Sequence, residues 1–189
     1  MNPNLNDVRV LLLPGWLDSG PGHWQTLWEE QYADTRVQQA DWQWPRRGDW
    51  MARLEEVLLE DDRPTLLAAH SLGCHLVAAW AAHSKHTARV LGALLVAPPD
   101  LEQTNTPPQL FNWRPVVRQR LPFPARVIYS EDDPFSAADA AAAIALEWGG
   151  LSLSVGARGH VNGDSGLGAW NEGRRLLAEL LAPRSRPAR

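Results

Sequence analysis

The strongest constraint on the fold of this chain is a regular alternation of short apolar runs with longer segments of helical character. The apolar runs, rich in Val, Leu and Ile, cover residues 8–13, 65–69, 90–97, 126–129 and 151–155. The helical segments cover residues 23–31, 50–59, 72–83, 137–148 and 168–181. Alternating strands and helices are typical of a parallel sheet, and unbroken apolar runs indicate strands buried on both faces. We therefore predict an α/β fold, with a mostly parallel sheet flanked by helices on both faces.

Smaller signals refine the element boundaries. Residues 36–40 are expected to add a short strand, Ser136 to be a helix N-cap and Gly149 to end that helix. Residues 98–124 contain seven prolines, which interrupt both helix and sheet. Two interpretations of this segment stay open, namely an excursion over the active edge of the sheet and a plain surface loop.

The length and charge of the chain limit its partners. Its 189 residues suit a single domain over residues 1–182, followed by an Arg- and Pro-rich segment, residues 183–189, that we expect to be a flexible tail. A formal charge of −4 gives no overall attraction to nucleic acid or to an anionic membrane, so a small neutral molecule is the expected partner. Polar residues follow Met1 where an export signal would be apolar, which indicates a cytoplasmic protein. The sequence does not indicate an oligomeric state.

Ser71 is the candidate nucleophile. The run Ala69-His70-Ser71-Leu72-Gly73 joins an expected strand to an expected helix, which is the context of a nucleophile elbow. The serine of such an elbow occupies a strained, tight turn, so the residues two positions before and after it must be small, as Ala69 and Gly73 are. The helix start also favours negative charge that develops nearby. The alternative is a serine that only caps the helix.

A serine hydroxyl needs a base to take its proton and an acid residue to orient that base. In α/β-hydrolases these residues follow in the order Ser, Asp or Glu, then His. Asp133 follows the fourth apolar run and His160 the fifth, so both are expected at the sheet edge that holds Ser71. Asp132 and Asp100 are the alternatives to Asp133, which we favour, and a plain surface-loop histidine is the alternative for His160.

Other residues are candidates for binding roles. The backbone N–H groups of Trp16 and Leu72 are expected to form an oxyanion hole. The chain has ten tryptophans, and Trp24 and Trp113, together with His23, are candidates for a substrate pocket, although core packing is the alternative for each tryptophan. The acidic residues and histidines lack metal-ligand spacing and no phosphate-binding or dinucleotide motif occurs, so no metal or cofactor is expected.

Sequence blocks along nearly the whole chain resemble the serine-hydrolase family of retinoblastoma-binding protein 9 and bacterial YdeN-like proteins, most closely its bacterial branch. The blocks are Leu13-Pro14-Gly15, Ser19-Gly20-Pro21-Gly22-His23-Trp24-Gln25, Gln39-Ala40-Asp41-Trp42, Asp49-Trp50, Ala69-His70-Ser71-Leu72-Gly73, Val96-Ala97-Pro98-Pro99-Asp100, Leu121-Pro122-Phe123-Pro124, Asp133-Pro134-Phe135, Gly159-His160-Val161-Asn162 and Ser165-Gly166-Leu167-Gly168. The resemblance implies a single-domain α/β-hydrolase without a large cap domain. It also implies a triad of Ser71, Asp133 and His160, because the acid residue of the family directly precedes a proline.

These observations predict a serine hydrolase that cleaves a carboxylester or related acyl bond through an acyl-enzyme intermediate. The resemblance does not define a natural substrate. The alternatives are an aminopeptidase-like amide hydrolase and a non-catalytic protein-binding module on a hydrolase scaffold.

Overall fold

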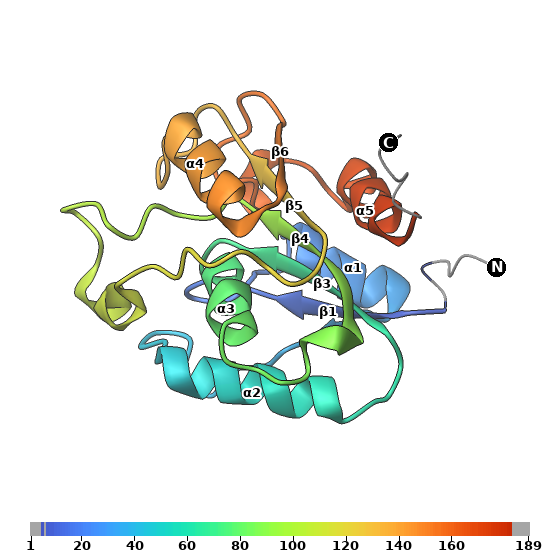
Figure 1. Cartoon of the computed structure of the whole chain (residues 1–189). Coiled ribbons are helices and arrows are strands. Elements are labelled where there is room, and N and C mark those ends of the chain that lie inside the picture. Colours follow the sequence, from blue (N-terminus) through green and yellow to red (C-terminus); the bar gives the residue numbers. More distant parts are fainter. Residues whose placement is uncertain (1–4, 6, 183–189) are drawn as a thin grey trace, which may run out of the picture.

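The protein is built around one parallel sheet, seen in the computed structural model, which describes residue 5 and residues 7–182 (Figure 1). The six strands lie in the order β2-β1-β3-β4-β5-β6, and every neighbouring pair is parallel. Their bounds are β1 Arg9–Leu13, β2 Thr35–Arg36, β3 Thr65–His70, β4 Val90–Val96, β5 Ala125–Tyr129 and β6 Leu151–Ser154. Because the strands share one direction, the loops that follow them emerge at one edge of the sheet.

Helices cover both faces of this sheet (Figure 1). Helices α1 (Trp24–Tyr32) and α5 (Asn171–Ala178) pack on one face, whereas α2 (Arg47–Leu59), α3 (Leu72–Ala81) and α4 (Ala138–Trp148) pack on the other. Short 3₁₀ helices complete the secondary structure: η1 Thr87–Arg89, η2 Pro108–Trp113, η3 Gly163–Ser165 and η4 Glu179–Leu181. The predicted α/β architecture is confirmed.

Side chains of the central strands alternate between two apolar clusters. Leu11 and Leu13 of β1 pack under α2, α3 and α4, whereas Val10 and Leu12 pack under α1 and α5. This alternation follows from the two-residue period of a strand, in which successive side chains point to opposite faces. An apolar run buried on both faces is therefore what the fold requires at this position.

Several element boundaries differ from the expected ones. The strand expected at residues 36–40 is only Thr35–Arg36. The expectation that Ser136 caps α4 is wrong, because the N-cap is Ala137 and no side chain caps the helix, whereas Gly149 ends it in the left-handed conformation as predicted. Helix α5 begins at Asn171 rather than near residue 168, because Trp170 has a φ of 39°. A left-handed residue cannot continue a right-handed helix.

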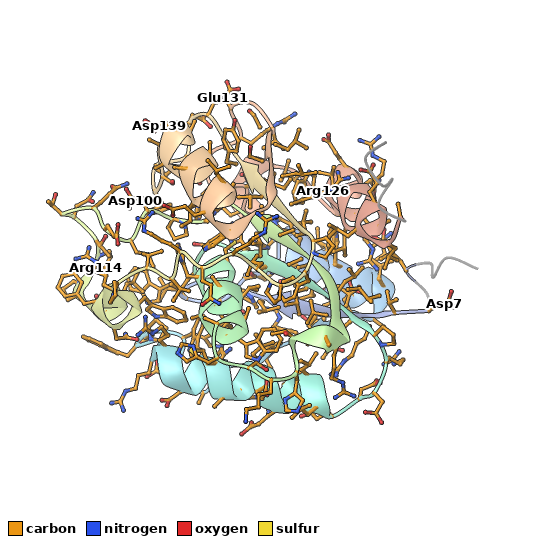
Figure 2. The ribbon with its side chains drawn as sticks, viewed as in Figure 1. Asp7, Asp100, Arg114, Arg126, Glu131 and Asp139 are labelled. Carbon is orange, nitrogen blue, oxygen red and sulfur yellow. The ribbon has the colours of Figure 1, made fainter. Side chains whose placement is uncertain are left out.

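The proline-rich segment, residues 98–124, is packed against the protein. Its apolar side chains join the cluster under α2, α3 and α4: they are Leu101, Leu110, Trp113, Leu121 and Phe123. Figure 2 shows Asp100 and Arg114 on this segment, and the Arg114 guanidinium donates to the backbone oxygens of Leu101 and Gln103. The segment is thus anchored by its own contacts and by the core, in contrast to a loose surface loop.

No helix in the described part of the chain is both long and apolar enough to cross a membrane. The tail expected at residues 183–189 lies outside the described residues.

Candidate active site

Ser71 stands in a tight turn between β3 and α3. Its φ of 53° and ψ of −124° lie outside the regions that non-glycine residues favour, and its N–H donates to the backbone oxygen of Val96 at 2.8 Å. The turn depends on glycines, because a Cβ at Gly73 would lie 2.2 Å from the backbone oxygen of Leu13, and one at Gly15 would lie 2.7 Å from Ser71 Cβ. The sequence therefore folds here into a strained elbow that exposes the serine at the sheet edge.

A continuous line of hydrogen bonds joins Ser71, His160 and Asp133. His160 Nε2 lies 2.9 Å from Ser71 Oγ, and His160 Nδ1 lies 3.0 and 2.9 Å from the two carboxylate oxygens of Asp133. The side chains of His160 and Asp133 are only 10% and 3% exposed. The Phe135 N–H donates to Asp133 Oδ1 at 2.9 Å and so fixes the carboxylate. In this geometry His160 can accept the serine proton while Asp133 holds the other ring nitrogen protonated.

Asp132 and Asp100, the alternatives to Asp133, lie in other hydrogen bonds. Asp132 Oδ1 accepts from Ser130 Oγ and from the N–H of Gly159, each at 2.7 Å. These hydrogen bonds, of which the one from Ser130 has the larger effect, lower the pKa of Asp132. Asp100 Oδ1 accepts from the backbone N–H of Glu102 in a local turn. Asp132 thus ties the loop before His160 to β5, a role that the sequence interpretation missed.

A cavity of about 390 Å³ opens beside Ser71. The residues around it come mainly from the loop after β1 and from the loop that carries His160: Gly15, Trp16, Asp18, Gly20, Pro21, Gly22, His23, His70, Ser71, His160, Asn162, Gly163 and Asp164. His23, a predicted pocket residue, therefore lies at the cavity. No residue of the proline-rich segment described above is among these, so that segment does not cover Ser71.

Trp24 and Trp113 do not line this cavity, which corrects the expectation for both. Trp24 is 1% exposed in the cluster under α1 and α5, where its indole N–H donates to the Val161 backbone oxygen at 3.0 Å. Trp113 is 2% exposed on the opposite face of the sheet, where its indole N–H donates to the Pro45 oxygen at 2.8 Å. Both are core residues, because their large apolar rings gain more from full burial than from a partly wet pocket.

Arg36, the last residue of β2, fixes the loop after β1, which lines the cavity. Its guanidinium donates to Asp18 Oδ1 at 2.7 Å and to the Ser19 backbone oxygen at 3.0 Å, and its side chain is 6% exposed. Ser19 Oγ in turn donates to Gln25 Oε1 at 2.7 Å. The loop after β1 is therefore fixed by buried polar contacts, which keeps the backbone of Trp16 beside the serine.

Neither predicted oxyanion donor has a hydrogen-bond acceptor within the described residues. Leu72 is the first residue of α3, so its N–H has no partner within the helix, and the N–H of Trp16 makes no bond in the loop after β1. Trp16 borders the cavity and Leu72 directly follows Ser71. Both groups are thus available to a ligand oxygen at Ser71.

The described residues offer neither a reactive cysteine nor a metal site. Cys74 is fully buried, and burial raises the pKa of its thiol well above its usual range, so the thiol remains protonated at neutral pH. Among the residues that the structure describes, no three or more His, Cys, Asp or Glu side chains are grouped so as to hold a metal ion.

Comparison with known proteins shows which family and which solved structures this chain resembles. A family model described as serine hydrolase matches residues 10–179, whereas no curated protein matches the sequence. A YdeN-like hydrolase from Pectobacterium atrosepticum superposes with a TM-score of 0.81 at 25% identity, over 94% of each chain. The ydeN gene product of B. subtilis has a TM-score of 0.74 at 20% identity, over 93% of this chain and 100% of that one.

A more distant structure, an esterase from Rhodococcus sp. ECU1013, has a TM-score of 0.66 at 15% identity, over 95% of this chain and 93% of its own. Together these matches confirm the α/β-hydrolase fold and the expected resemblance to YdeN-like hydrolases.

Proposed function

The chain belongs to the serine hydrolase family, and we propose that it hydrolyses an ester-like acyl bond with Ser71 as nucleophile, His160 as base and Asp133 as the acid residue of a triad. The observation that carries this proposal is the hydrogen-bond line from Ser71 Oγ through both nitrogens of His160 to the buried Asp133 carboxylate. Such a line supplies a proton acceptor where the nucleophile needs one and an anion where the imidazolium forms.

The reaction proceeds in two halves. Ser71 Oγ bonds to the acyl carbon while its proton moves to His160 Nε2, and the imidazolium then gives that proton to the leaving oxygen as the acyl bond breaks. Water next attacks the acyl-enzyme, with His160 taking its proton and returning it to Ser71 Oγ as the acid product leaves. Asp133 remains ionised throughout and stabilises the imidazolium.

The N–H groups of Trp16 and Leu72 are the proposed donors to the tetrahedral oxyanion. Both lack an acceptor in the described structure, and a backbone donor lost from such a site costs roughly 3 kcal/mol of transition-state stabilisation. The cavity of about 390 Å³, which is open and partly polar, suits a small neutral acyl substrate. The solved relative named as an esterase supports an ester over an amide.

Labelling with a fluorophosphonate probe tests the nucleophile. The wild type is expected to be labelled, Ser71→Ala to be unlabelled, and Ser84→Ala to be labelled like the wild type, because Ser84 bonds to Glu55 away from the cavity. Circular dichroism checks that each variant is folded. A folded wild type that resists the probe contradicts the proposal and favours a non-catalytic binding module.

A panel of substrates tests which type of bond is cleaved. p-Nitrophenyl esters of increasing acyl length are compared with aminoacyl p-nitroanilides at equal concentration. Turnover is expected to be highest for short, neutral acyl esters and to vanish in Ser71→Ala. A higher kcat/KM for the anilides would replace the ester assignment with an amide hydrolase that uses the same residues.

A further inference from the structure

Two buried histidines, His23 and His70, lie beside His160 without a role in the proposed proton transfer. His70 Nε2 is 2.8 Å from the backbone oxygen of His160, and His70 Nδ1 is 3.3 Å from His23 Nε2. His23 Nδ1 accepts from the backbone N–H of Gln25 at 3.1 Å, which makes His23 the N-cap of α1. The three imidazole rings are in edge contact, with centroids 4.5 Å apart for His23 and His70 and 4.8 Å apart for His70 and His160.

The partners of these rings permit one arrangement of protons. A carbonyl oxygen only accepts, so His70 carries its proton on Nε2 and leaves Nδ1 as an acceptor. His23 Nε2 must then donate to His70, and His23 Nδ1 is free to accept from Gln25. Each ring is neutral and both of its nitrogens are hydrogen-bonded. The donors therefore form a chain in one direction, from the Gln25 N–H to His23, from His23 to His70 and from His70 to the His160 carbonyl.

The His160 carbonyl, which His70 contacts, lies in a strained loop. Val161, the next residue, has a φ of 50°, a conformation that a β-branched side chain rarely adopts, and it is fully buried. Besides a local hydrogen bond from the Val161 N–H to the Arg158 oxygen at 3.3 Å, contacts with distant parts of the protein hold this geometry. Two side chains do so directly: His70 donates to the His160 oxygen, and Trp24 donates to the Val161 oxygen.

We propose that His70, oriented by His23, is a positioning residue that holds His160 at hydrogen-bond distance from Ser71 by fixing the His160 carbonyl. This inference rests on the proposed hydrolysis through Ser71. His70 acts through the backbone of the base and needs no contact with the substrate. Removal of its N–H frees the strained peptide between His160 and Val161, so the imidazole is displaced from the serine.

Burial keeps the rings of His23 and His70 neutral, as this positioning role requires. Burial, followed by the charges of neighbouring groups, lowers the pKa of His23 to about 3 and that of His70 well below its usual range. Both rings therefore stay neutral where a serine hydrolase works, and neither places a positive charge beside His160. A buried cation there would oppose formation of the imidazolium.

Two amide variants separate donation from ring packing. In His70→Gln the amide nitrogen can take the place of Nε2 and donate to the His160 oxygen, whereas in His70→Asn the amide is too short to reach it. His70→Leu removes both polar atoms. The matched control is His75→Leu, because His75 is 5% exposed, like His70, and is likewise 2.8 Å from a backbone oxygen, that of Pro99.

Steady-state kinetics on a p-nitrophenyl ester give the first readout. His70→Leu and His70→Asn are expected to lose about 10- to 100-fold in kcat with KM within about threefold of the wild type, since a shift of about 1 Å at a catalytic group has this effect. His70→Gln is expected to recover most of the loss, and His75→Leu to keep the wild-type kcat. If His70→Leu fails to fold, the Gln and Asn pair alone carries the comparison.

Proton NMR gives a readout that does not need turnover. The His160 Nδ1 proton, bonded to Asp133, should resonate far downfield in the wild type and in His70→Gln, and should broaden through exchange with water in His70→Asn. Equal kcat values and equal resonances for Gln and Asn would overturn the positioning role, as would a change confined to KM. Failure of the wild type to react with the fluorophosphonate probe would instead contradict the proposed function, whatever the NMR shows.

Discussion

Acidification from pH 7 to pH 5 is expected to cost the fold about 4 kcal/mol through His23 and His75 alone, because both are buried as neutral rings. Burial is the main cause that lowers the pKa of His75 from 6.5 to about 4 and that of His23 to about 3. In the unfolded chain both rings take up a proton near pH 6.5, whereas in the folded protein they do not. Their contribution to stability is therefore complete above pH 6.5 and is lost as the pH falls toward 4 and 3.

The magnitude follows from the interval between pH 6.5 and pH 5. One pKa unit corresponds to about 1.4 kcal/mol, so each ring gives up about 2 kcal/mol across this interval. His70, whose pKa is also lowered by burial, acts in the same direction. Asp34 opposes them, since burial raises the pKa of its carboxyl. The loss is large beside the roughly 5–15 kcal/mol by which domains of this kind are stable.

Urea unfolding at pH 7 and pH 5, followed by tryptophan fluorescence, measures the difference. The His75→Leu variant isolates one ring, because the contributions of Asp34 and the other groups cancel between it and the wild type. The difference between the two pH values should shrink by about 2 kcal/mol in His75→Leu, because this variant lacks the ring whose pKa burial lowers to about 4. A His75→Leu protein with the pH dependence of the wild type would refute the reasoning.

Two other predictions concern the elbow and the loop of His160. Gly73→Ala is expected to lose about 1–3 kcal/mol of unfolding free energy in urea and to react about 100-fold more slowly with a fluorophosphonate, because its Cβ would meet the Leu13 oxygen. Gly48→Ala, on α2, has no atom within 4 Å of its Cβ, so it should not lower the unfolding free energy and should leave the labelling rate unchanged. Trp24→Phe removes the donor to Val161 and should lower kcat about tenfold, whereas Trp113→Phe, which loses a similar buried donor, should lower stability alone. Equal kcat values for these two tryptophan variants would contradict the assigned role of Trp24.

Much of this fold was predictable because its signals are local. Apolar runs marked five of the strands to within about two residues, and small residues around Ser71 marked the elbow, because a strained turn restricts its immediate neighbours. The order of residue types along a hydrolase chain pointed to Asp133 and His160. The resemblance pointed to Asp133 rather than Asp132, because the acid residue of the family precedes a proline. In the structure the two adjacent carboxylates point in different directions, and Asp133 contacts His160 whereas Asp132 accepts from Ser130.

The pocket tryptophans were placed wrongly because side-chain burial depends on distant partners. Trp24 and Trp28, four residues apart on α1, share one helical face, and this spacing was a usable sign of a core position. Trp113 gave no such sign, because its segment has no helical period and its partner Pro45 lies 68 residues away. The contact of His70 with the His160 carbonyl spans 90 residues and leaves no local trace.

Contacts between segments far apart in the sequence have a consequence for how the protein folds during synthesis. Trp24 bonds to Val161, Trp28 to Ala169 and Asp34 to Arg174, over separations of 137, 141 and 140 residues. During synthesis from the N-terminus, the apolar face that α1 and α5 share therefore stays incompletely covered until residues 161–177 have left the ribosome. His160 reaches its place at the same stage, so a nascent chain that stops short of it carries Ser71 on its elbow without an ordered base.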